Sequence, residues 1–242
     1  MKTFRVIRAL AAGLLIGFMT GGCAAQNDDT PMDPLEGMNR FFFDMNQRLD
    51  RHAALPAASF YHSSVPAPAR TTFHNVLDNL GGPVTCANDL LQLDFSNAGI
   101  AAARFIVNTT IGVAGIFDVA TGWGLPGRPR DFGETLGTYG VPPGPYLVLP
   151  LRGSTDVRDF TGNYLDGYFS PLRYVRYDGR EYIGLVKSTL GSVDTRSANI
   201  ITFRDIERAS VDYYATMRAY YLQRRQRQIE DRAAQMDELP DF

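Results

Sequence analysis

The stretch GETLGTYGVPPGPYLVLPLRGSTDVRD, residues 133–159, decides the fold because it fits no ordinary element. Prolines at positions 142, 143, 145 and 150 remove backbone donors and fix φ, which excludes a long helix or a central strand. Its apolar residues follow neither a period of 3.6 nor a period of two. The stretch is also too apolar for a loop in water, so the rest of the sequence has to explain its environment.

The composition is that of a folded protein with a high share of aromatic residues. The chain has 242 residues, of which 45% are hydrophobic and 12% aromatic, enough for a sizeable core. Aromatic residues are over-used at interfaces and at the boundary of a membrane. The formal net charge of −2, without a basic stripe upstream of the C-terminal helix, excludes nucleic acid as a partner.

The N-terminus has the layout of a lipoprotein signal. A basic start is followed by the apolar run ALAAGLLIGFMT and then by Gly-Gly-Cys. We therefore expect residues 1–22 to be a signal peptide, Cys23 to be lipidated, and residues 23–32 to be a tether. Ala24 after the cysteine resembles an outer-membrane address, on the periplasmic face. Thr20 departs from the leucine that usually stands three residues before the cysteine, and the alternative is a plain signal peptide that happens to contain a cysteine.

The segment DPLEGMNRFFFDMNQRLDRHAAL, from residue 33, predicts an amphipathic helix. Asp33 is the expected N-cap, and Met38, Phe42, Met45 and Leu49 share one face. Phenylalanines at 41 and 43 stand away from that face, where a helix in water would carry polar residues. Two interpretations stay open: a helix buried on two sides, or a helix with one face in protein and the other in acyl chains.

The remaining segments predict further helices and no transmembrane one. We expect a connection at 55–70, a helix that ends at Gly81-Gly82-Pro83, and an interfacial helix capped by Asn97. Residues 154–156 are expected to cap another helix. The longest periodic segment, residues 202–236, ends in arginines that we expect to be solvated, Arg224, Arg225 and Arg227.

Catalytic and metal-binding motifs are missing from the sequence. The three histidines, His52, His62 and His74, do not form a zinc pattern. No P-loop and no G-x-S-x-G elbow occurs, and Ser154 follows only one glycine. The sequence therefore predicts a protein that is not an enzyme and that uses neither a cofactor nor a metal.

Four segments together resemble a known family. They are DPLEGMNRFFFDMN, RFIVNTTIGVAGIFDVA, the opening stretch, and YYATMRAYYLQRR, which occur in order from residue 33 to about residue 225. This pattern resembles the MlaA (VacJ) family of outer-membrane lipoproteins. The resemblance implies an all-α fold, a ring of amphipathic helices that lies in the inner leaflet around a central channel. The ring domain is expected at 33–230 and a flexible tail at 231–242.

The resemblance also implies a role in lipid asymmetry. Proteins of this family remove phospholipids mislocalised to the outer leaflet and pass them to a periplasmic MlaC-like carrier, and their usual partner is a trimeric porin. Two alternatives stay open. One is a structural lipoprotein that braces a porin without moving lipid, and the other is a lipid hydrolase that uses Ser154.

The expected site combines a gate and a channel wall. We expect a semi-rigid hairpin at 137–151 that edges the channel, with glycines as hinges and prolines as stiffeners; the alternative is a plug of core. Its residues are Gly137, Tyr139, Gly140, Gly144, Pro145, Tyr146 and Pro150.

Four further residues are expected to contact the channel or the lipid. The resemblance implies that Lys187 is a basic channel-side residue that attracts phosphate, with a snorkelling surface lysine as the alternative. It also places Asp44 and Met45 where altered packing leaves the channel open. Phe42, on the same helix, is expected to contact lipid or line the channel.

Overall fold

The computed structural model describes residues 33–174 and 180–237, within the compact unit Asp33–Phe242. The predicted signal peptide at 1–22, Cys23, the tether at 23–32 and the last five residues of the predicted tail lie outside the described residues. The described part is mostly helical, which confirms the predicted class, and it contains one two-stranded sheet. Among the described residues no helix is long and apolar enough to cross a membrane.

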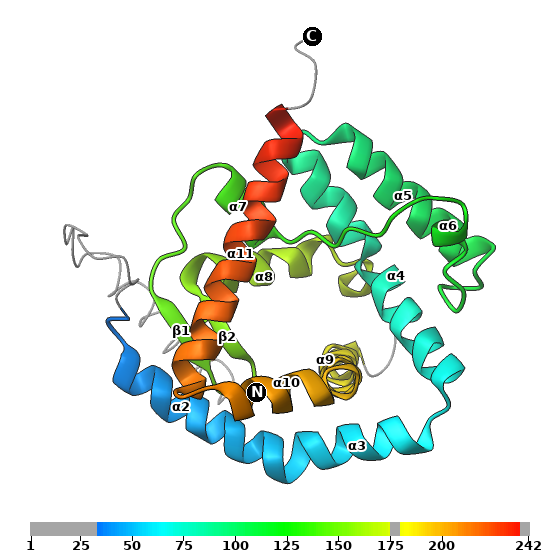
Figure 1. Cartoon of the computed structure of the whole chain (residues 1–242). Coiled ribbons are helices and arrows are strands. Elements are labelled where there is room, and N and C mark those ends of the chain that lie inside the picture. The colour runs from blue at the N-terminus through cyan, green and yellow to red at the C-terminus, as the bar shows by residue number, and fades with distance from the viewer. Residues whose placement is uncertain (1–32, 175–179, 238–242) are drawn as a thin grey trace. The chain divides into compact units, whose positions relative to one another are not determined.

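The first helices follow one another along an arc (Figure 1). They are α2 (Glu36–Leu49), the π-helical turn η1 (Asp50–Ala54), α3 (Leu55–Ser64) and α4 (Ala67–Leu91). The predicted connection at 55–70 is therefore wrong, because its prolines stand in or next to first turns, where the missing N–H would have had no helical partner.

Helix α4 also continues through Gly81-Gly82-Pro83, where the sequence predicted its end. The reason is tertiary packing against α5 (Phe95–Thr110). A Cβ at Gly82 would lie 3.2 Å from Cβ of Phe105, so the glycine allows a close approach of the two helices. Packing between α4 and α5 outweighs the local cost of Pro83.

Aspartates begin the helices that follow. Asp94, Asp118 and Asp131 are the N-caps of α5, α6 (Val119–Gly122) and α7 (Phe132–Thr138), and each side chain accepts a hydrogen bond from the third backbone N–H of its helix. The predicted cap Asn97 is wrong, since its backbone N–H is the donor to Asp94. Asp33 does not cap α2 either; its carboxylate accepts from the N–H of Leu35, and α2 begins at Glu36.

The second half contains the hairpin and the remaining helices. Strands β1 (Tyr146–Leu149) and β2 (Gly153–Asp156) pair antiparallel, with Tyr146 opposite Asp156 and Leu149 opposite Gly153. Asp156 then caps α8 (Val157–Phe169), as residues 154–156 predicted. The chain continues through η2 (Pro171–Arg173), α9 (Arg180–Ala198), α10 (Ile200–Ala209) and α11 (Tyr213–Asp237).

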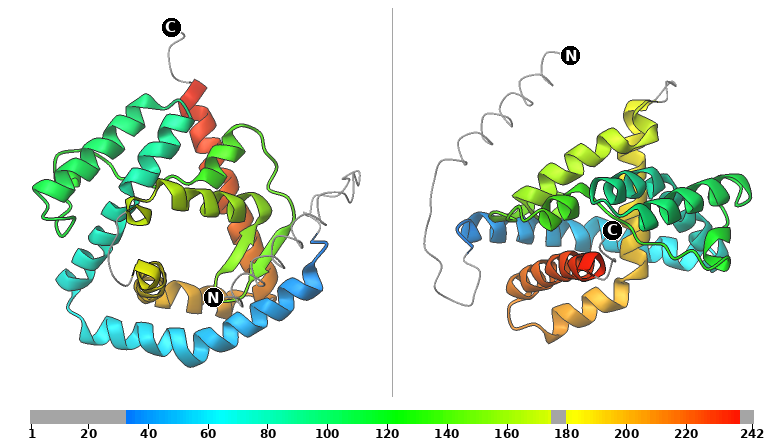
Figure 2. Two further views of the ribbon diagram at one scale, coloured as in Figure 1. Left: turned by 180° about the vertical axis from the view of Figure 1, so that it is seen from behind. Right: turned by 90° about the horizontal axis from the view of Figure 1, so that it is seen from above.

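The predicted single helix at 202–236 is interrupted between α10 and α11. The carboxylate of Asp212 accepts from the N–H of Ala215 and so begins a new helix. Helix α11 then continues to Asp237, beyond the predicted end of the ring domain at 230. Figure 2 shows α10 and α11 on one side of the layer that contains α2 and α3, while the joined ends of α8 and α9 project on the other side.

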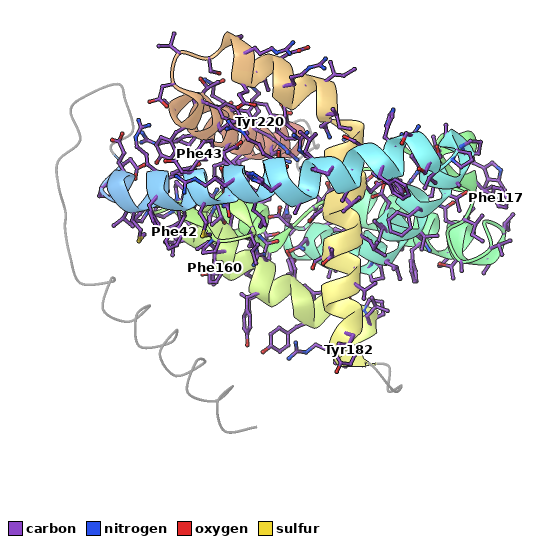
Figure 3. The ribbon with its side chains drawn as sticks, turned by 90° about the horizontal axis from the view of Figure 1, so that it is seen from below. Phe42, Phe43, Phe117, Phe160, Tyr182 and Tyr220 are labelled. Carbon is purple, nitrogen blue, oxygen red and sulfur yellow. The ribbon has the colours of Figure 1, made fainter. Side chains whose placement is uncertain are left out.

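The interior is polar and the surface carries large apolar side chains. The buried apolar cluster is small: Phe43, Tyr146, Val148 and Tyr214, with Phe42, Tyr213, Met217 and Tyr221 packed on it. The largest fully buried side chains are, apart from Val148, all polar or charged: Gln92, Glu134, Asn39, Asn88, Asp89 and Asp156. Phe117 and Tyr182, in contrast, lie on the outside of the ribbon (Figure 3).

This distribution bears on the two interpretations of α2 that the sequence left open. Asn39 and Phe43 are the buried residues of this helix, whereas Met38, Met45 and Leu49 are exposed and Phe42 is partly buried. Phe41 is 65% exposed. The helix therefore directs a polar and aromatic face inward and an apolar face outward, the reverse of an amphipathic helix in water.

Arg225 holds α11 to α7 and α8. Its nitrogens bind Asp131 at 2.8 and 2.9 Å and Asp159 at 2.7 Å, so the prediction of a solvated Arg225 is wrong. Burial by itself lowers the pKa of Arg225, but the two carboxylates raise it well above the usual range. Glu134, also buried here, has its pKa raised to about 7 by burial, against the opposing charge of Arg130.

Two glycines let α7 and α8 pack at close range, and one of them gives a matched test. A Cβ at Gly162 would lie 2.7 Å from Cα of Gly133, whereas a Cβ at Gly167 on the same helix meets nothing within 4 Å. We expect Gly162→Ala to destabilise the protein by about 1–3 kcal/mol through overpacking. Gly167→Ala should stabilise it by roughly 0.5–1 kcal/mol. Thermal unfolding in detergent checks both; equal midpoints for the two variants would contradict the close packing of α7 on α8.

Candidate functional site

The hairpin has a free edge that helix α2 satisfies with side chains. Asn39 donates through Nδ2 to the carbonyl of Tyr146 and accepts through Oδ1 from the N–H of Val148, both at 2.9 Å. Asn46, seven residues later on α2, pairs in the same way. Its Nδ2 donates to the carbonyl of Leu149 at 2.9 Å, and its Oδ1 accepts from the N–H of Leu151 at 2.8 Å. The two amides thus pair four backbone groups of β1 and the turn after it, at the edge where a third strand would otherwise bind.

The predicted gate divides into three parts in the structure. Gly137 belongs to α7, residues 139–145 form an exposed loop, and the strands begin only at Tyr146. The hairpin therefore spans 146–156, and the predicted bounds 137–151 are wrong. The reason is that α7 uses Gly137 for close contact with Ile229 and Arg158, not for a hinge.

The other predicted gate residues occupy different environments. Gly140 and Gly144 have φ of +79° and +72°, the left-handed region that favours glycine, and they make the loop turn. Tyr139 is exposed and donates its hydroxyl to the carbonyl of Leu91, and Tyr146 is buried in the apolar cluster. Pro145 and Pro150 are exposed at the two ends of β1.

Phe42, Asp44 and Met45 do not share a cavity with Lys187. Asp44 and Met45 are exposed, and Phe42 packs on the apolar cluster that contains Phe43 and Tyr146. These residues lie instead on the helix that holds the hairpin, between Asn39 and Asn46. Altered packing here would act on β1 directly.

Lys187 lines a cavity of about 580 Å³ between α4, α9 and α10. The wall consists of Leu77, Gly184, Lys187, Ser188, Gly191, Ser192, Thr195, Arg196 and Phe203. Among the described residues this wall contains two cations and three hydroxyl side chains but no carboxylate. Burial lowers the pKa of Lys187, and no carboxylate among the described residues pairs with it. The cavity therefore offers an uncompensated positive charge.

Helix α9 presents this polar face on one half of its circumference. With about 3.6 residues per turn, the cavity-lining residues from Lys187 to Arg196 fall within one half of the helix. Tyr182, Val186 and Leu190 fall on the opposite half, and all three are exposed. Small and hydroxyl-bearing residues thus occupy one side of α9 and large apolar residues the other, and both sides are exposed here.

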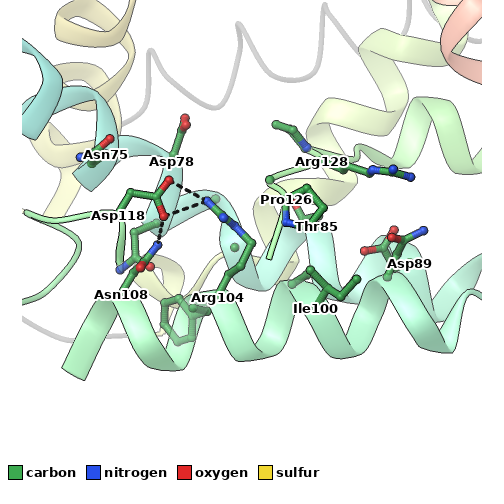
Figure 4. Close-up of a pocket in the computed structure, with 18 of the residues that line it drawn as sticks. Asn75, Asp78, Thr85, Asp89, Ile100, Arg104, Asn108, Asp118, Pro126 and Arg128 are labelled. Atoms are coloured by element: carbon green, nitrogen blue, oxygen red, sulfur yellow. Dashed lines mark hydrogen bonds and ion pairs between the residues drawn. The ribbon is translucent and has the colours of Figure 1, made fainter. Parts of the chain in front are cut away.

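A second cavity, of about 200 Å³, lies between α4, α5 and the segment 126–129 (Figure 4). Arg104 pairs there with Asp118 at 3.1 Å, and Asn108 donates to the same carboxylate at 2.9 Å. Burial would raise the pKa of Asp118, but these hydrogen bonds and those from Thr121 lower it to about 2. These contacts hold the start of α6 to α5. Because Arg104, Asn108 and Asp118 already bind one another, they are not available to bind a ligand.

Sequence reasoning named Lys187, whose role stays a prediction, but did not name Asn39, Asn46, Asp50 or Arg196. A signal existed for the first two, since asparagines seven residues apart lie on the same face of a helix as Phe43. No comparable signal existed for the pair Asp50–Arg196, whose partners are far apart in the sequence.

Comparison with known proteins identifies the family to which this architecture belongs. The family model described as MlaA lipoprotein matches residues 31–228. The chain belongs to the MlaA lipoprotein family. It is 36% identical over 221 residues to the intermembrane phospholipid transport system lipoprotein MlaA of Escherichia coli K12, covering 89% of this chain and 84% of that protein. The Haemophilus influenzae protein of the same name is 32% identical over 242 residues, covering 96% of this chain and 92% of the relative.

A solved structure agrees with the same family. It comes from work on the structural basis for maintenance of bacterial outer membrane lipid asymmetry and superposes with a TM-score of 0.75 at 34% identity. The match covers 82% of this chain and all of that one. Membership in the MlaA family confirms the prediction that the chain is not an enzyme, since the named relatives are lipid-transport lipoproteins.

The asparagine clamp on the hairpin gives a testable consequence. Asn39→Ala leaves the carbonyl of Tyr146 and the N–H of Val148 without partners, which costs about 1–3 kcal/mol for each buried group. We expect lower thermal stability and faster amide hydrogen exchange at Val148. Asn163→Ala, at an exposed position on α8, is the matched control and should change neither. Unchanged exchange at Val148 in the Asn39 variant would rule out the clamp.

Proposed function

We propose that this protein removes mislocalised phospholipids from the outer leaflet of the outer membrane and passes them to a periplasmic lipid carrier. It is anchored through lipidated Cys23 and lies in the inner leaflet on the periplasmic side. The described helices surround a passage whose wall includes the polar face of α9, and the lipid crosses it without any covalent step.

The observation that carries the proposal is the reversed distribution of polar and apolar side chains. Large apolar residues are exposed on α2, α5, α9 and α10, while asparagine, glutamine and carboxylates fill the interior. In water this distribution would be unfavourable, because exposing large apolar side chains to solvent costs free energy. In a lipid leaflet the same surface is solvated by acyl chains. The names of the relatives support phospholipid as the transported molecule.

Lys187 gives the passage its attraction for a head group. Moving a phospholipid head group through hydrocarbon costs several kcal/mol, and a polar wall removes most of that cost. The uncompensated charge of Lys187 attracts the phosphate, and the hydroxyl-bearing face of α9 keeps the path polar. The acyl chains travel beside the exposed apolar half of α9.

The remaining parts of the proposal concern partners and gating. The partners are a trimeric porin, which holds the protein at its place in the membrane, and an MlaC-like carrier that accepts the lipid. Since no nucleotide is used, a carrier of higher affinity sets the direction of transfer. The loop at 139–145 and the hairpin that follows it edge the passage and control its opening.

Deletion of the gene tests transport against the bracing alternative. Transport predicts more phosphatidylethanolamine in the outer leaflet, measured by labelling intact cells with an amine-reactive reagent that does not cross the membrane. A protein that only braces a porin predicts no such increase.

Cys23→Ala should lose outer-membrane fractionation, and normal sorting of this variant would remove the lipid anchor from the proposal.

Ser154→Ala should transport normally, whereas a hydrolase would be inactivated.

Lys187 is tested by charge reversal. We expect Lys187→Glu to reduce complementation of the deletion strain at least tenfold, because the phosphate then meets a negative charge in a partly buried wall. Lys187→Ala should have a smaller effect in the same direction. Arg204→Glu, an exposed cation on α10, is the control and should complement fully. Full complementation by Lys187→Glu would mean that the lysine only lies at the surface.

A further inference from the structure

The joined ends of α8 and α9 differ from the rest of the exposed surface in their side chains. Four tyrosines and one arginine, the tyrosine tip, are exposed there: Tyr164, Tyr168, Arg173, Tyr174 and Tyr182. The large exposed side chains of α2 and α5 are instead methionine, leucine, isoleucine and phenylalanine. Figure 2 shows that these joined ends project from the layer of α2 and α3, on the side opposite α10 and α11.

Contacts among the side chains of the tyrosine tip hold their polar edges at the surface. The rings of Tyr164 and Tyr168 meet edge to face with centroids 5.7 Å apart, and their hydroxyl oxygens are 3.2 Å apart. The guanidinium carbon of Arg173 lies 3.9 Å from the ring centroid of Tyr168, and the hydroxyl of Tyr174 donates to the carbonyl of Tyr168 at 2.7 Å. Such rings, with an arginine among them, are typical of the boundary between hydrocarbon and head groups.

The charge of the tyrosine tip complements an anion. The carboxylates of α8 are directed to other elements, since Asp159 binds an arginine of α11 and Asp166 accepts from an asparagine of α4. Arg158, the other cation of this helix, is buried. Within residues 157–174, Arg173 is therefore the one exposed charged side chain. A phosphate at the surface of a lipid leaflet is the matching group.

Helix α9 reaches one leaflet away from the arc of helices. Asp194 binds the hydroxyl of Tyr61 on α3 at 3.2 Å, which fixes this part of α9 at the level of the arc. Tyr182 lies twelve residues earlier, about 18 Å along the helix axis, and half of a bilayer's hydrocarbon core is about 15 Å thick. The exposed side chains between them, Val186 and Leu190, are apolar. Apolar residues followed by a tyrosine at this distance are the order expected where a helix passes from hydrocarbon to head groups.

The side of the molecule that carries α10 has a different chemistry. Arg204 and Asp205 form an exposed ion pair on α10, and Glu207 of the same helix pairs with the exposed Arg51. Exposed charges of both signs suit water. The two sides therefore favour different surroundings, water beside α10 and a lipid leaflet beside the tyrosine tip.

We propose that the tyrosine tip lies in the head-group layer of the outer leaflet and contacts the phosphates of phospholipids there. This inference rests on the proposed function, which places the ring in the inner leaflet, so that the charged side faces the periplasm and the tip faces the opposite leaflet. Lys187 lies five residues beyond Tyr182, about 7.5 Å along the helix axis. A phospholipid held at the tip is therefore already near the cavity that Lys187 lines.

The first test measures depth in the membrane with the full-length, lipidated protein in vesicles of phosphatidylethanolamine and phosphatidylglycerol. A nitroxide label is attached to Tyr182→Cys, Leu190→Cys or Arg204→Cys, each combined with Cys86→Ser to remove the free thiol. Collision with oxygen and with a water-soluble nickel chelate gives the depth of each label. We expect the Leu190 label in hydrocarbon, the Arg204 label in water, and the Tyr182 label at head-group depth, about 12 Å from the Leu190 label, the axial distance of eight residues.

The outcomes of this test separate the inference from the proposed function. A Tyr182 label in water together with a Leu190 label in hydrocarbon overturns the inference and leaves the membrane placement of the ring intact. A Tyr182 label as deep as the Leu190 label also overturns it. Both labels in water contradict the membrane placement itself, and the inference fails with it.

The second test measures the phosphate contact. A photoreactive p-benzoylphenylalanine replaces Tyr174, and the protein is cross-linked in vesicles of equal phosphatidylcholine and phosphatidylglycerol. We expect adducts with the anionic lipid to dominate, and Arg173→Gln to reduce this preference about fivefold, the usual effect of one cation at an anionic surface. Arg204→Gln, on the charged side, is the matched control and should leave the ratio unchanged. An unchanged ratio in Arg173→Gln, at an unchanged unfolding midpoint, overturns the phosphate contact.

The same photoreactive protein in intact cells identifies what covers the tip. Phospholipid adducts at position 174, identified by their mass, support the inference. Adducts with another protein in their place show that the tip is a protein-docking surface and overturn the lipid assignment. Absence of additional outer-leaflet phospholipid in the deletion strain would contradict transport without changing either the label depths or the adduct ratio.

Discussion

Every buried polar group needs a hydrogen-bond partner, and this protein buries more large polar side chains than large apolar ones. The fold therefore depends on satisfying those groups inside the chain. Asn88, Thr135 and Gln92 bond one another where α4 meets α7, and Arg225 joins Asp131 to Asp159. Without such networks an interior of this kind would be less stable than an apolar core.

The same requirement explains how the opening stretch tolerates its setting. Its strands bond each other on one side, and the outer edge of β1 is completed by Asn39 and Asn46 of α2. Its prolines stand outside both strands, where no ladder hydrogen bond is lost. Gly140 and Gly144 supply the two left-handed residues of the loop. A segment that looked irregular in the sequence thus contains a short hairpin whose outer strand bonds to asparagine side chains of α2.

Sequence reasoning succeeded where local chemistry decides and failed where the surroundings decide. The helical class was implied by the family resemblance, and the cap at Asp156 follows from a side-chain acceptor, which acts locally. Periodicity identified an apolar face of α2 but left open which way that face points, because hydrophobic periodicity decides this only where water lies outside and an apolar core inside. Gly82 and Pro83 did not end α4, since Phe105 packs on the glycine from another helix. The burial of Arg225 depends on Asp131 and Asp159, distant partners that no local pattern indicates.

The reversed distribution also determines what the cavity beside Lys187 can do. In a protein with water outside, an uncompensated lysine and a paired arginine on one helix would be of little consequence, because solvent screens them. In the proposed setting, with acyl chains on the exposed face of α9, the field of Lys187 would act over a longer range toward the cavity. In that setting Lys187, which pairs with no carboxylate among the described residues, is the proposed attractor of a head group, because Asp50 already neutralises Arg196. An attraction that breaks no existing ion pair is what the entry of a charged head group requires.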